Sequence, residues 1–218
     1  MNILAIGSHP DDLEYGCGGS LARYAEAGHD VTMLIMTLGE QGGVPDIREG
    51  EQKSAAEALG AKDVIFGGYA DTRVTLDQQL IGFIERTIQN VKPDMIFVHY
   101  GNDSHQDHRS INMATLSAAR YIPNLLFYEG PTTIEFHPSI FVNVSSTLEK
   151  KVQALKEHGS QVTKTNIPKT NILEMAVATA TFRGTQGRVG AAEAFLSARL
   201  FLDPLETNDY PPLTPHPR

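Results

Sequence analysis

Short apolar runs alternate with helical patterns through the first half of the chain, and this alternation restricts the fold more than any other feature of the sequence. Each apolar run leads into a polar, glycine-containing stretch, as a buried strand leads into a loop. The predicted strands are 3–7, 31–37, 64–66 and 95–99, and the predicted helices are 19–27, 46–59, 76–91 and 109–120. Repeated strand–helix units of this kind are typical of a parallel sheet with right-handed crossovers, and continuously apolar strands indicate helices on both faces.

We therefore predict an α/β fold: a Rossmann-like, doubly wound, mostly parallel sheet with helices on both faces and a smaller, irregular C-terminal α/β part. In that second part we predict strands at 125–128 and 140–144, helices at 146–158 and 171–182, and an apolar stretch at 191–202. A chain of 218 residues suits one domain. We place that domain at 1–202, followed by a proline-rich C-terminal arm at 203–218 that cannot be regular structure.

Composition excludes several classes of protein. Cys17 is the single cysteine, so the chain has no intramolecular disulfide and suits a reducing compartment. The net charge of −8 argues against binding to nucleic acid or to an anionic membrane surface. No apolar run is long enough to span a membrane, and the N-terminus lacks the basic region of a signal peptide. We expect a cytoplasmic protein with no nucleic-acid or membrane partner.

Two clusters of polar residues follow the first and the fourth predicted strand, at 8–12 and 102–108. The carboxyl ends of parallel strands share one edge of the sheet, and ligands bind in the crevice there. Three histidines and four carboxylates should therefore meet: His9, His105, His108, Asp11, Asp12, Asp103 and Asp107.

Carboxylates packed this closely repel one another unless a cation compensates their charge. Two imidazoles and one carboxylate with an open position form a common catalytic zinc set. A turn can bring His9 and Asp12 to one metal, with His108 arriving from the second cluster. Taken singly, these residues have ordinary explanations, such as an aspartate pair that caps a helix. Their combination at one sheet edge favours a metal site.

The sequence His-Pro-Asp-Asp at 9–12, together with His-Gln-Asp-His at 105–108, resembles the LmbE-like, or PIG-L, family of zinc-dependent de-N-acetylases. The resemblance covers roughly residues 1–200, and the nearest branch is the bacillithiol-type N-acetylglucosaminyl-malate deacetylases. It implies one zinc ion per subunit, held by His9, Asp12 and His108. It also implies Asp11 as general base and His105, paired with Asp107, as the group that assists at the oxyanion and the leaving group.

The chemistry of the residue types agrees with these roles. A carboxylate beside a metal ligand can take a proton from activated water near neutral pH. We expect Asp107 to fix the tautomer of His105 and to raise its pKa. We predict substrate contacts for Arg48, and for Tyr69 and Asp71, which follow the third strand. His99 is interpreted as a core histidine. Residues 183–188 are interpreted as a mobile, glycine-rich loop at the rim of the site.

The predicted function is zinc-dependent hydrolysis of the N-acetyl group of an N-acetylglucosamine conjugate by a homo-oligomer. Other substrates of the family stay open, namely a thiol conjugate or an antibiotic precursor. A ferrous iron site is disfavoured, because such triads normally occupy β-barrels. A non-catalytic sugar- or nucleotide-binding protein is the alternative from another class, but the glycines at 16–19 do not match a phosphate loop.

Overall fold

The computed structural model describes residues 1–165 and 167–201. Its strands are β1 (Asn2–Gly7), β2 (Asp30–Thr37), β3 (Asp63–Tyr69), β4 (Met95–His99), β5 (Asn124–Tyr128), β6 (Ile140–Asn143) and β7 (Ala192–Arg199). Its helices are α1 (Asp12–Glu26), α2 (Pro45–Leu59), α3 (Gln78–Val91), α4 (Gln106–Ala118), α5 (Leu148–Glu157) and α6 (Ile172–Gly187).

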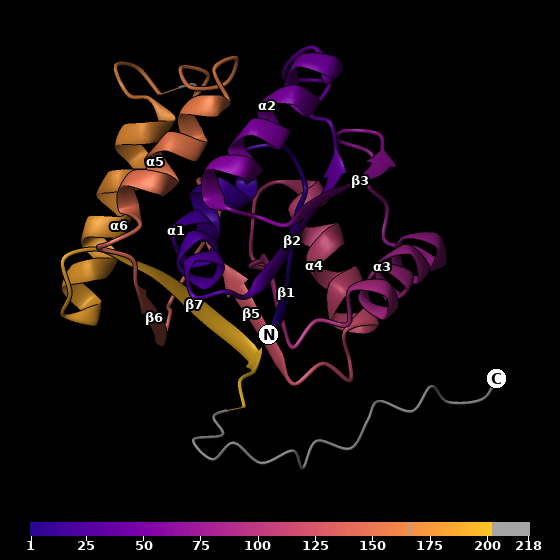
Figure 1. Cartoon of the computed structure of the whole chain (residues 1–218). Helices are drawn as coiled ribbons and strands as arrows, with labels where there is room; N and C mark the ends of the chain where they lie inside the picture. Colours follow the sequence, from indigo (N-terminus) through magenta and orange to yellow (C-terminus); the bar gives the residue numbers. More distant parts are fainter. Residues whose placement is uncertain (166, 202–218) are drawn as a thin grey trace.

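All the described strands belong to one sheet, in the order β3-β2-β1-β4-β5-β7-β6 (Figure 1). Strands β1 to β5 run parallel, whereas β7 is antiparallel to both β5 and β6. The predicted Rossmann-like, mostly parallel fold is therefore confirmed. Within the apolar stretch predicted at 191–202, residues Ala192–Arg199 form strand β7, which pairs with β5 on one side and with β6 on the other.

Helices cover both faces of the sheet, as predicted. Helices α1, α2 and α5 lie on one face, and α3 and α4 lie on the other (Figure 1). Alternate residues of one strand serve the two cores: Phe97 belongs to the first, and Ile96 and Val98 belong to the second. Both cores are built from buried, mainly aliphatic side chains, which explains why the strands are apolar along their whole length.

Helix α1 begins at Asp12, seven residues before the predicted start at residue 19. Three glycines in its first half lower helix propensity, which is why the pattern indicated a loop there. Tertiary packing overrides that propensity, because the glycines let the helix lie directly on the sheet. A methyl group on Gly16 would lie 2.1 Å from Cδ2 of Tyr128, and one on Gly19 would lie 2.9 Å from Cβ of Val144.

Two further boundaries differ from the prediction and change how the chemistry is presented. Helix α4 begins at Gln106 rather than at residue 109, so Asp107 and His108 project from its first turn instead of from a loop. Helix α6 continues to Gly187, so most of the expected mobile rim at 183–188 is helical. Arg183 is held there by Glu129, with a distance of 2.6 Å from its Nε to Oε1.

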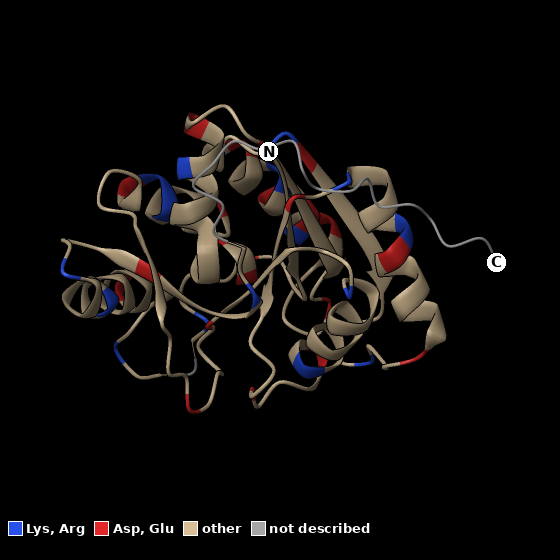
Figure 2. Ribbon diagram, turned by 90° about the horizontal axis from the view of Figure 1, so that it is seen from below, with Lys and Arg blue, Asp and Glu red and all other residues tan. Residues whose placement is uncertain are grey.

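Acidic and basic residues are interspersed along the ribbon in the view from below (Figure 2). Within residues 1–165 and 167–201, no helix is both long and apolar enough to cross a membrane. The predicted C-terminal arm at 203–218 lies outside the described residues.

Candidate metal centre

The two polar clusters meet where the strand order of the sheet reverses. Strands β1 and β4 are neighbours, while the strands next in sequence to β1 lie on its other side. The loops that leave the carboxyl ends of β1 and β4 therefore border one crevice, which is where open α/β sheets bind ligands. The prediction that both clusters share one edge is confirmed.

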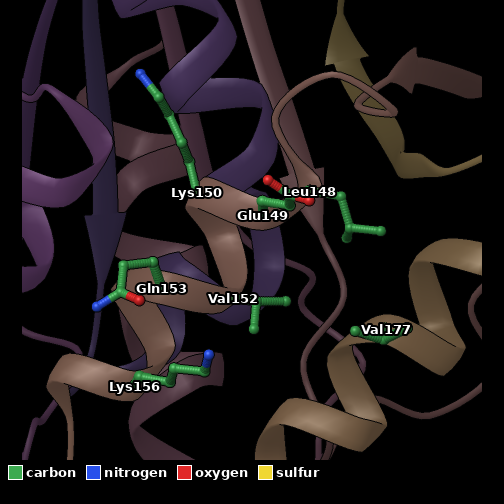
Figure 3. Close-up of a pocket in the computed structure, with 7 residues that line it drawn as sticks. All are labelled: Leu148, Glu149, Lys150, Val152, Gln153, Lys156 and Val177. Atoms are coloured by element: carbon green, nitrogen blue, oxygen red, sulfur yellow. The ribbon is translucent and has the colours of Figure 1, made fainter.

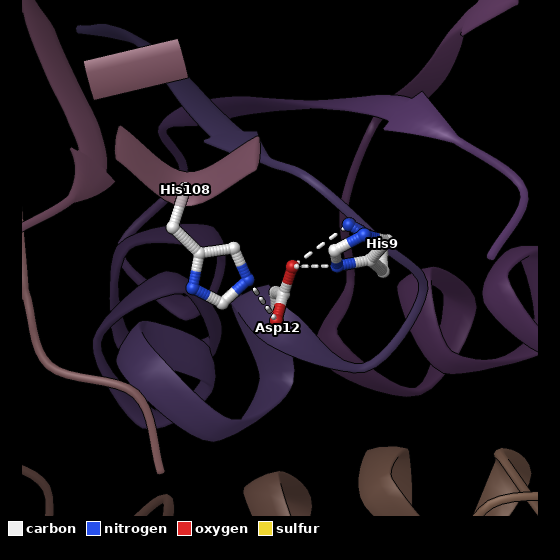
Figure 4. A group of neighbouring side chains, drawn as sticks. All are labelled: His9, Asp12 and His108. Atoms are coloured by element: carbon white, nitrogen blue, oxygen red, sulfur yellow. Dashed lines mark hydrogen bonds and ion pairs between the residues drawn. The ribbon is translucent and has the colours of Figure 1, made fainter. Parts of the chain in front are cut away.

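His9, Asp12 and His108 form the centre of this crevice, with the Asp12 carboxylate between the two imidazoles (Figure 4). One ligand atom from each of these residues lies within 4.8 Å of the others. The Asp12 carboxylate is 3.2 Å from His9 Nδ1 through Oδ2, and 3.5 Å from His108 Nε2 through Oδ1. The backbone N–H of His9 also donates to Oδ2 at 2.7 Å, which fixes the carboxylate against the turn.

Each imidazole is oriented from behind by a second carboxylate. Asp71 Oδ1 lies 3.0 Å from His9 Nε2, and Asp103 Oδ2 lies 3.2 Å from His108 Nδ1. If these ring nitrogens carry the protons, the lone pairs of His9 Nδ1 and His108 Nε2 face Asp12. Carboxylate-backed histidines of this kind are typical metal ligands.

A buried ring nitrogen supports the same interpretation. His108 Nε2 is buried and makes no hydrogen bond of ordinary geometry among the described residues, although Asp12 Oδ1 faces it at 3.5 Å. A cation in this position, either a proton or a metal ion, compensates the buried carboxylate. Two nitrogens and one carboxylate suit a divalent transition metal better than magnesium or calcium, which prefer oxygen ligands only.

The electrostatics show how strongly the carboxylates attract positive charge. Burial disfavours the charged imidazolium of His108, but Asp12 and Asp103 outweigh it and raise the pKa of His108 to about 9. Burial also opposes the charge of Asp12, yet the neighbouring His108 and His99 hold its pKa well below the usual range. Without a metal, protons on the imidazoles supply the compensating charge, so metal binding must displace them.

Asp11 lies next to this group, with its carboxylate partly exposed and 3.5 Å from Arg48 Nη2. It occupies the N-cap position of α1, but its side chain makes no capping hydrogen bond. Its backbone is left-handed, with φ of 94°, and its side chain keeps 27% exposure. Burial and repulsion by Asp12 raise the pKa of Asp11 to about 6. A carboxyl group with this pKa can exchange a proton near neutral pH.

Among the described residues no hydrogen bond joins the His105 imidazole to the Asp107 carboxylate, although His9, His105 and Asp107 each offer an atom within 4.8 Å of the others. That carboxylate accepts the backbone N–H groups of Thr72 at 2.8 Å and Val74 at 3.2 Å, and Oδ2 lies 3.4 Å from His9 Nε2. His105 Nδ1 instead accepts the backbone N–H of Asp107 at 3.3 Å. Burial and the neighbouring His108 and His9 lower the pKa of His105 on balance, although Asp107 acts in the expected direction and raises it.

The three predicted substrate contacts occupy different environments. Asp71 is buried against His9, as described above. Arg48 is also buried, and its guanidinium binds the carbonyl oxygens of Gly39 at 2.8 Å and Pro10 at 2.7 Å. Tyr69 packs its ring against Phe83, with the centroids 5.8 Å apart. Their contacts with substrate stay predictions.

Two residues of the centre, His99 and Asp103, were not assigned a role there from the sequence. His99 stacks on His108 with ring centroids 3.8 Å apart, and its Nε2 accepts the N–H of Ser8 at 3.0 Å. Burial and the adjacent His108 lower the pKa of His99 to about 4, so its ring is neutral. The preferred interpretation as a simple core histidine is therefore incomplete. The signal was its position at the end of β4, directly before the second cluster.

Asp103 is the second of these residues. It belongs to the second cluster, yet its task was not identified. Besides facing His108, its carboxylate accepts the His105 N–H at 2.8 Å and the Thr133 hydroxyl at 3.0 Å. Asp103 therefore holds the loop after β4 and the imidazole together.

A separate hollow of about 620 Å³ lies between α5 and α6 (Figure 3). Apolar side chains of Leu148, Val152 and Val177 line it, with Lys150 and Lys156 at its border. None of the predicted site residues lines it, so the candidate centre is the crevice at the end of β1 and β4.

A solved structure shares nearly the whole fold. The conserved protein TT1542 from Thermus thermophilus superimposes with a TM-score of 0.83 at 27% identity, covering 99% of both chains. The hydratase GalB from Pseudomonas putida shares the fold with a TM-score of 0.80 at 21% identity, covering 93% of this chain and 98% of GalB. The fold alone therefore does not determine the reaction.

Relatives identified by sequence indicate the family and the type of reaction. The uncharacterized deacetylase YaiS of Escherichia coli is 39% identical over 168 residues, which cover 72% of this chain and 90% of YaiS. A probable N-acetyl-α-D-glucosaminyl L-malate deacetylase of Bacillus cereus is 29% identical over 185 residues, covering 73% of this chain and 83% of the relative. The model of the GlcNAc-PI de-N-acetylase family, PIG-L, matches residues 4–119. The chain belongs to the PIG-L family and is an amide-hydrolysing enzyme.

Proposed function

We propose that this enzyme removes the acetyl group from an N-acetylglucosamine conjugate, using a zinc ion held by His9, Asp12 and His108 and a base at Asp11. One observation carries the proposal: the partly exposed carboxylate of Asp11, with a pKa of about 6, lies beside a group of residues that can hold a metal. The family and the relatives named for N-acetylglucosaminyl substrates support the choice of amide.

The proposed ligand atoms are His9 Nδ1, the Asp12 carboxylate and His108 Nε2. With Asp71 and Asp103 holding protons on the opposite ring nitrogens, His9 and His108 would each offer a lone pair to a bound ion. Zinc bound by three protein ligands acts as a Lewis acid and lowers the pKa of a water molecule from 15.7 to about 7.

Asp11 accepts a proton from the attacking water as its oxygen adds to the amide carbon. The proton then passes from Asp11 to the amide nitrogen, the C–N bond breaks, and acetate and a free amine leave. One carboxyl group serves both transfers because its pKa of about 6 lies close to neutral pH.

His105 is the proposed donor to the developing oxyanion. Since its Nδ1 accepts the Asp107 N–H, the ring proton is placed on Nε2, and this tautomer can donate in the neutral state. The rings of His9 and His108 each lie 4.7 Å from the ring of His105, measured between centroids. Asp107 supports this arrangement indirectly, by joining the start of α4 to the 72–74 backbone and to His9.

The substrate is proposed to be a small amino-sugar conjugate. The other N-acyl substrates of the family are alternatives that the same chemistry accommodates. The homo-oligomer, the cytoplasmic location and the division into a domain at 1–202 and an arm at 203–218 stay predictions.

Amine release from a panel of N-acetylglucosamine conjugates tests the proposal, using the zinc-loaded enzyme and a chelated control. Asp11→Asn is expected to lower kcat by about 10²-fold or more while zinc stays bound, because the base is lost. Asp46→Asn, which changes an exposed carboxylate in the first turn of α2, is the matched control.

Two outcomes would overturn different parts of the proposal. If no conjugate yields amine although zinc binds stoichiometrically, the substrate class is wrong. If Asp11→Asn retains the turnover of Asp46→Asn, Asp11 is not the base.

A further inference from the structure

Arg48 lies against Asp11 rather than at an open surface. Its side chain has 5% exposure, and Nη2 lies 3.5 Å from Asp11 Oδ2 and donates to the Pro10 carbonyl at 2.7 Å. The same nitrogen thus contacts the Asp11 carboxylate and the peptide group that precedes Asp11. Nη1 donates to the Gly39 carbonyl at 2.8 Å, on the loop after β2.

We infer that Arg48 is a positioning residue, which holds the backbone and carboxylate of Asp11 in the orientation that general-base catalysis needs. The inference rests on the proposed function for the role of Asp11, but it assigns Arg48 a task other than substrate contact. Its guanidinium bridges the loop after β1, which carries Asp11, to the loop after β2.

The backbone of Asp11 shows why such a support is needed. Its φ of 94° lies in the left-handed region, which costs a non-glycine residue free energy unless surrounding contacts compensate. The orientation of the Pro10–Asp11 peptide decides this angle, and Arg48 binds the carbonyl oxygen of that peptide. A charge-assisted hydrogen bond to this carbonyl opposes relaxation to an ordinary φ.

The space around Arg48 is shaped for the guanidinium. A methyl group on Gly39 would lie 1.7 Å from Nη1, and one on Gly43 would lie 3.3 Å from Cδ. Gly39 itself has φ of 63°. Both Nη atoms are engaged by protein carbonyls, which leaves little freedom for Arg48 to reorient toward a ligand.

Lysine cannot replace this arrangement fully. An ammonium group is a single point of donation, whereas the planar guanidinium contacts two carbonyls and a carboxylate from two nitrogens. Arg48→Lys is therefore expected to keep the positive charge but to lose part of the orientation. Arg48→Met removes both while keeping much of the side-chain volume.

Steady-state kinetics distinguish positioning from substrate binding. For Arg48→Met, kcat is expected to fall about 10- to 100-fold with KM changed less than about 2-fold, because only the reacting geometry is disturbed. Arg48→Lys should lie between Arg48→Met and wild type, and millimolar guanidinium should restore part of the kcat of Arg48→Ala. Arg120→Met, which removes an exposed guanidinium, is the control. A raised KM with unchanged kcat would overturn the inference in favour of substrate contact.

A double-mutant cycle tests whether Arg48 acts through Asp11. In the Asp11→Asn background, Arg48→Met should change the residual kcat by less than about 2-fold, because the group that it positions is already lost. If Arg48→Met lowers kcat by the same factor in the Asp11→Asn background as in the wild type, the inference is overturned.

The thermal stability of the metal-free protein gives a readout that needs no substrate. Arg48→Met should lower Tm by at least about 2 °C more when Asp11 is present than when it is asparagine, since an unpaired carboxylate is then left behind. Equal effects of Arg48→Met in both backgrounds would overturn the inference. If the wild-type enzyme deacetylates nothing but this coupling is found, the proposed function fails and the positioning contact stands.

Discussion

His9 Nε2 lies 3.0 Å from Asp71 Oδ1, so the ring nitrogen opposite the candidate metal position is held by a buried carboxylate. Asp71 is itself held in place, because its Oδ2 accepts the backbone N–H of Gln41 at 2.9 Å. The contact joins the loop after β3 to the loop after β1. Such partners set the tautomer and the orientation of a metal-binding histidine.

Replacing Asp71 should therefore weaken metal binding without removing a ligand. For Asp71→Asn we expect zinc affinity to fall about 10- to 100-fold, as measured by competition with a chromophoric chelator. Asp63→Asn, at the exposed start of β3, serves as the control. Unchanged affinity in Asp71→Asn would contradict the role of the His9–Asp71 contact.

Metal addition should stabilise the protein selectively. Zinc at about 100 times its Kd should add about 2.7 kcal/mol to the free energy of unfolding, because it replaces the protons that now balance the carboxylates. Magnesium should have little effect, since it prefers oxygen ligands. Thermal unfolding at fixed pH with each metal measures this.

The stabilisation by zinc should disappear in His108→Ala and persist in His137→Ala, which changes an exposed loop histidine. An equal rise in Tm for His108→Ala and wild type would show that zinc binds elsewhere.

The raised pKa of Asp11 predicts a stability cost at alkaline pH. Burial and Asp12 raise it to about 6, whereas an unfolded aspartate titrates near 3.9. The folded state thus holds the proton more tightly, and the contribution of Asp11 to stability is present below about pH 4 and is lost as the pH rises through about 6.

Asp11→Asn should consequently stabilise the metal-free protein by on the order of 2 kcal/mol at pH 8, and by about half as much at pH 5. Asparagine tolerates the left-handed backbone, so the comparison reports the charge. Denaturant unfolding in the presence of a chelator at both pH values provides the measurement. A gain that is the same at pH 5 and pH 8 would point to a cause other than titration of Asp11.

Because α1 lies in close contact with the sheet, substitution by alanine should affect stability in opposite directions at Gly16 and Gly50. Gly16→Ala should destabilise the protein by about 1–3 kcal/mol through overpacking, since its methyl group would meet Tyr128 at 2.1 Å. Gly50→Ala, in α2 with open space around it, should instead stabilise by up to about 1 kcal/mol. Urea unfolding of both variants tests this; equal effects would mean that the α1 contact adapts freely.

The parallel core could be predicted from the sequence because the pattern that indicates each buried strand lies within that strand. The strands around Ile96 and Phe97 are apolar on both faces, and this pattern follows directly from burial between two helical layers. The start of α1 could not be predicted in the same way. Its glycines argue against a helix until Tyr128, more than 100 residues later in the chain, is placed against them.

The α/β architecture, the sheet edge that carries the chemistry, and the group formed by His9, Asp12 and His108 were all predictable from the sequence. These follow from periodicity and from the rule that parallel strands share one edge. Only the tertiary structure decided which carboxylate serves which histidine. Asp107 faces His9 rather than His105, and Asp103 faces His108, because hydrogen-bond partners depend on side-chain direction and on backbone amides from loops distant in sequence.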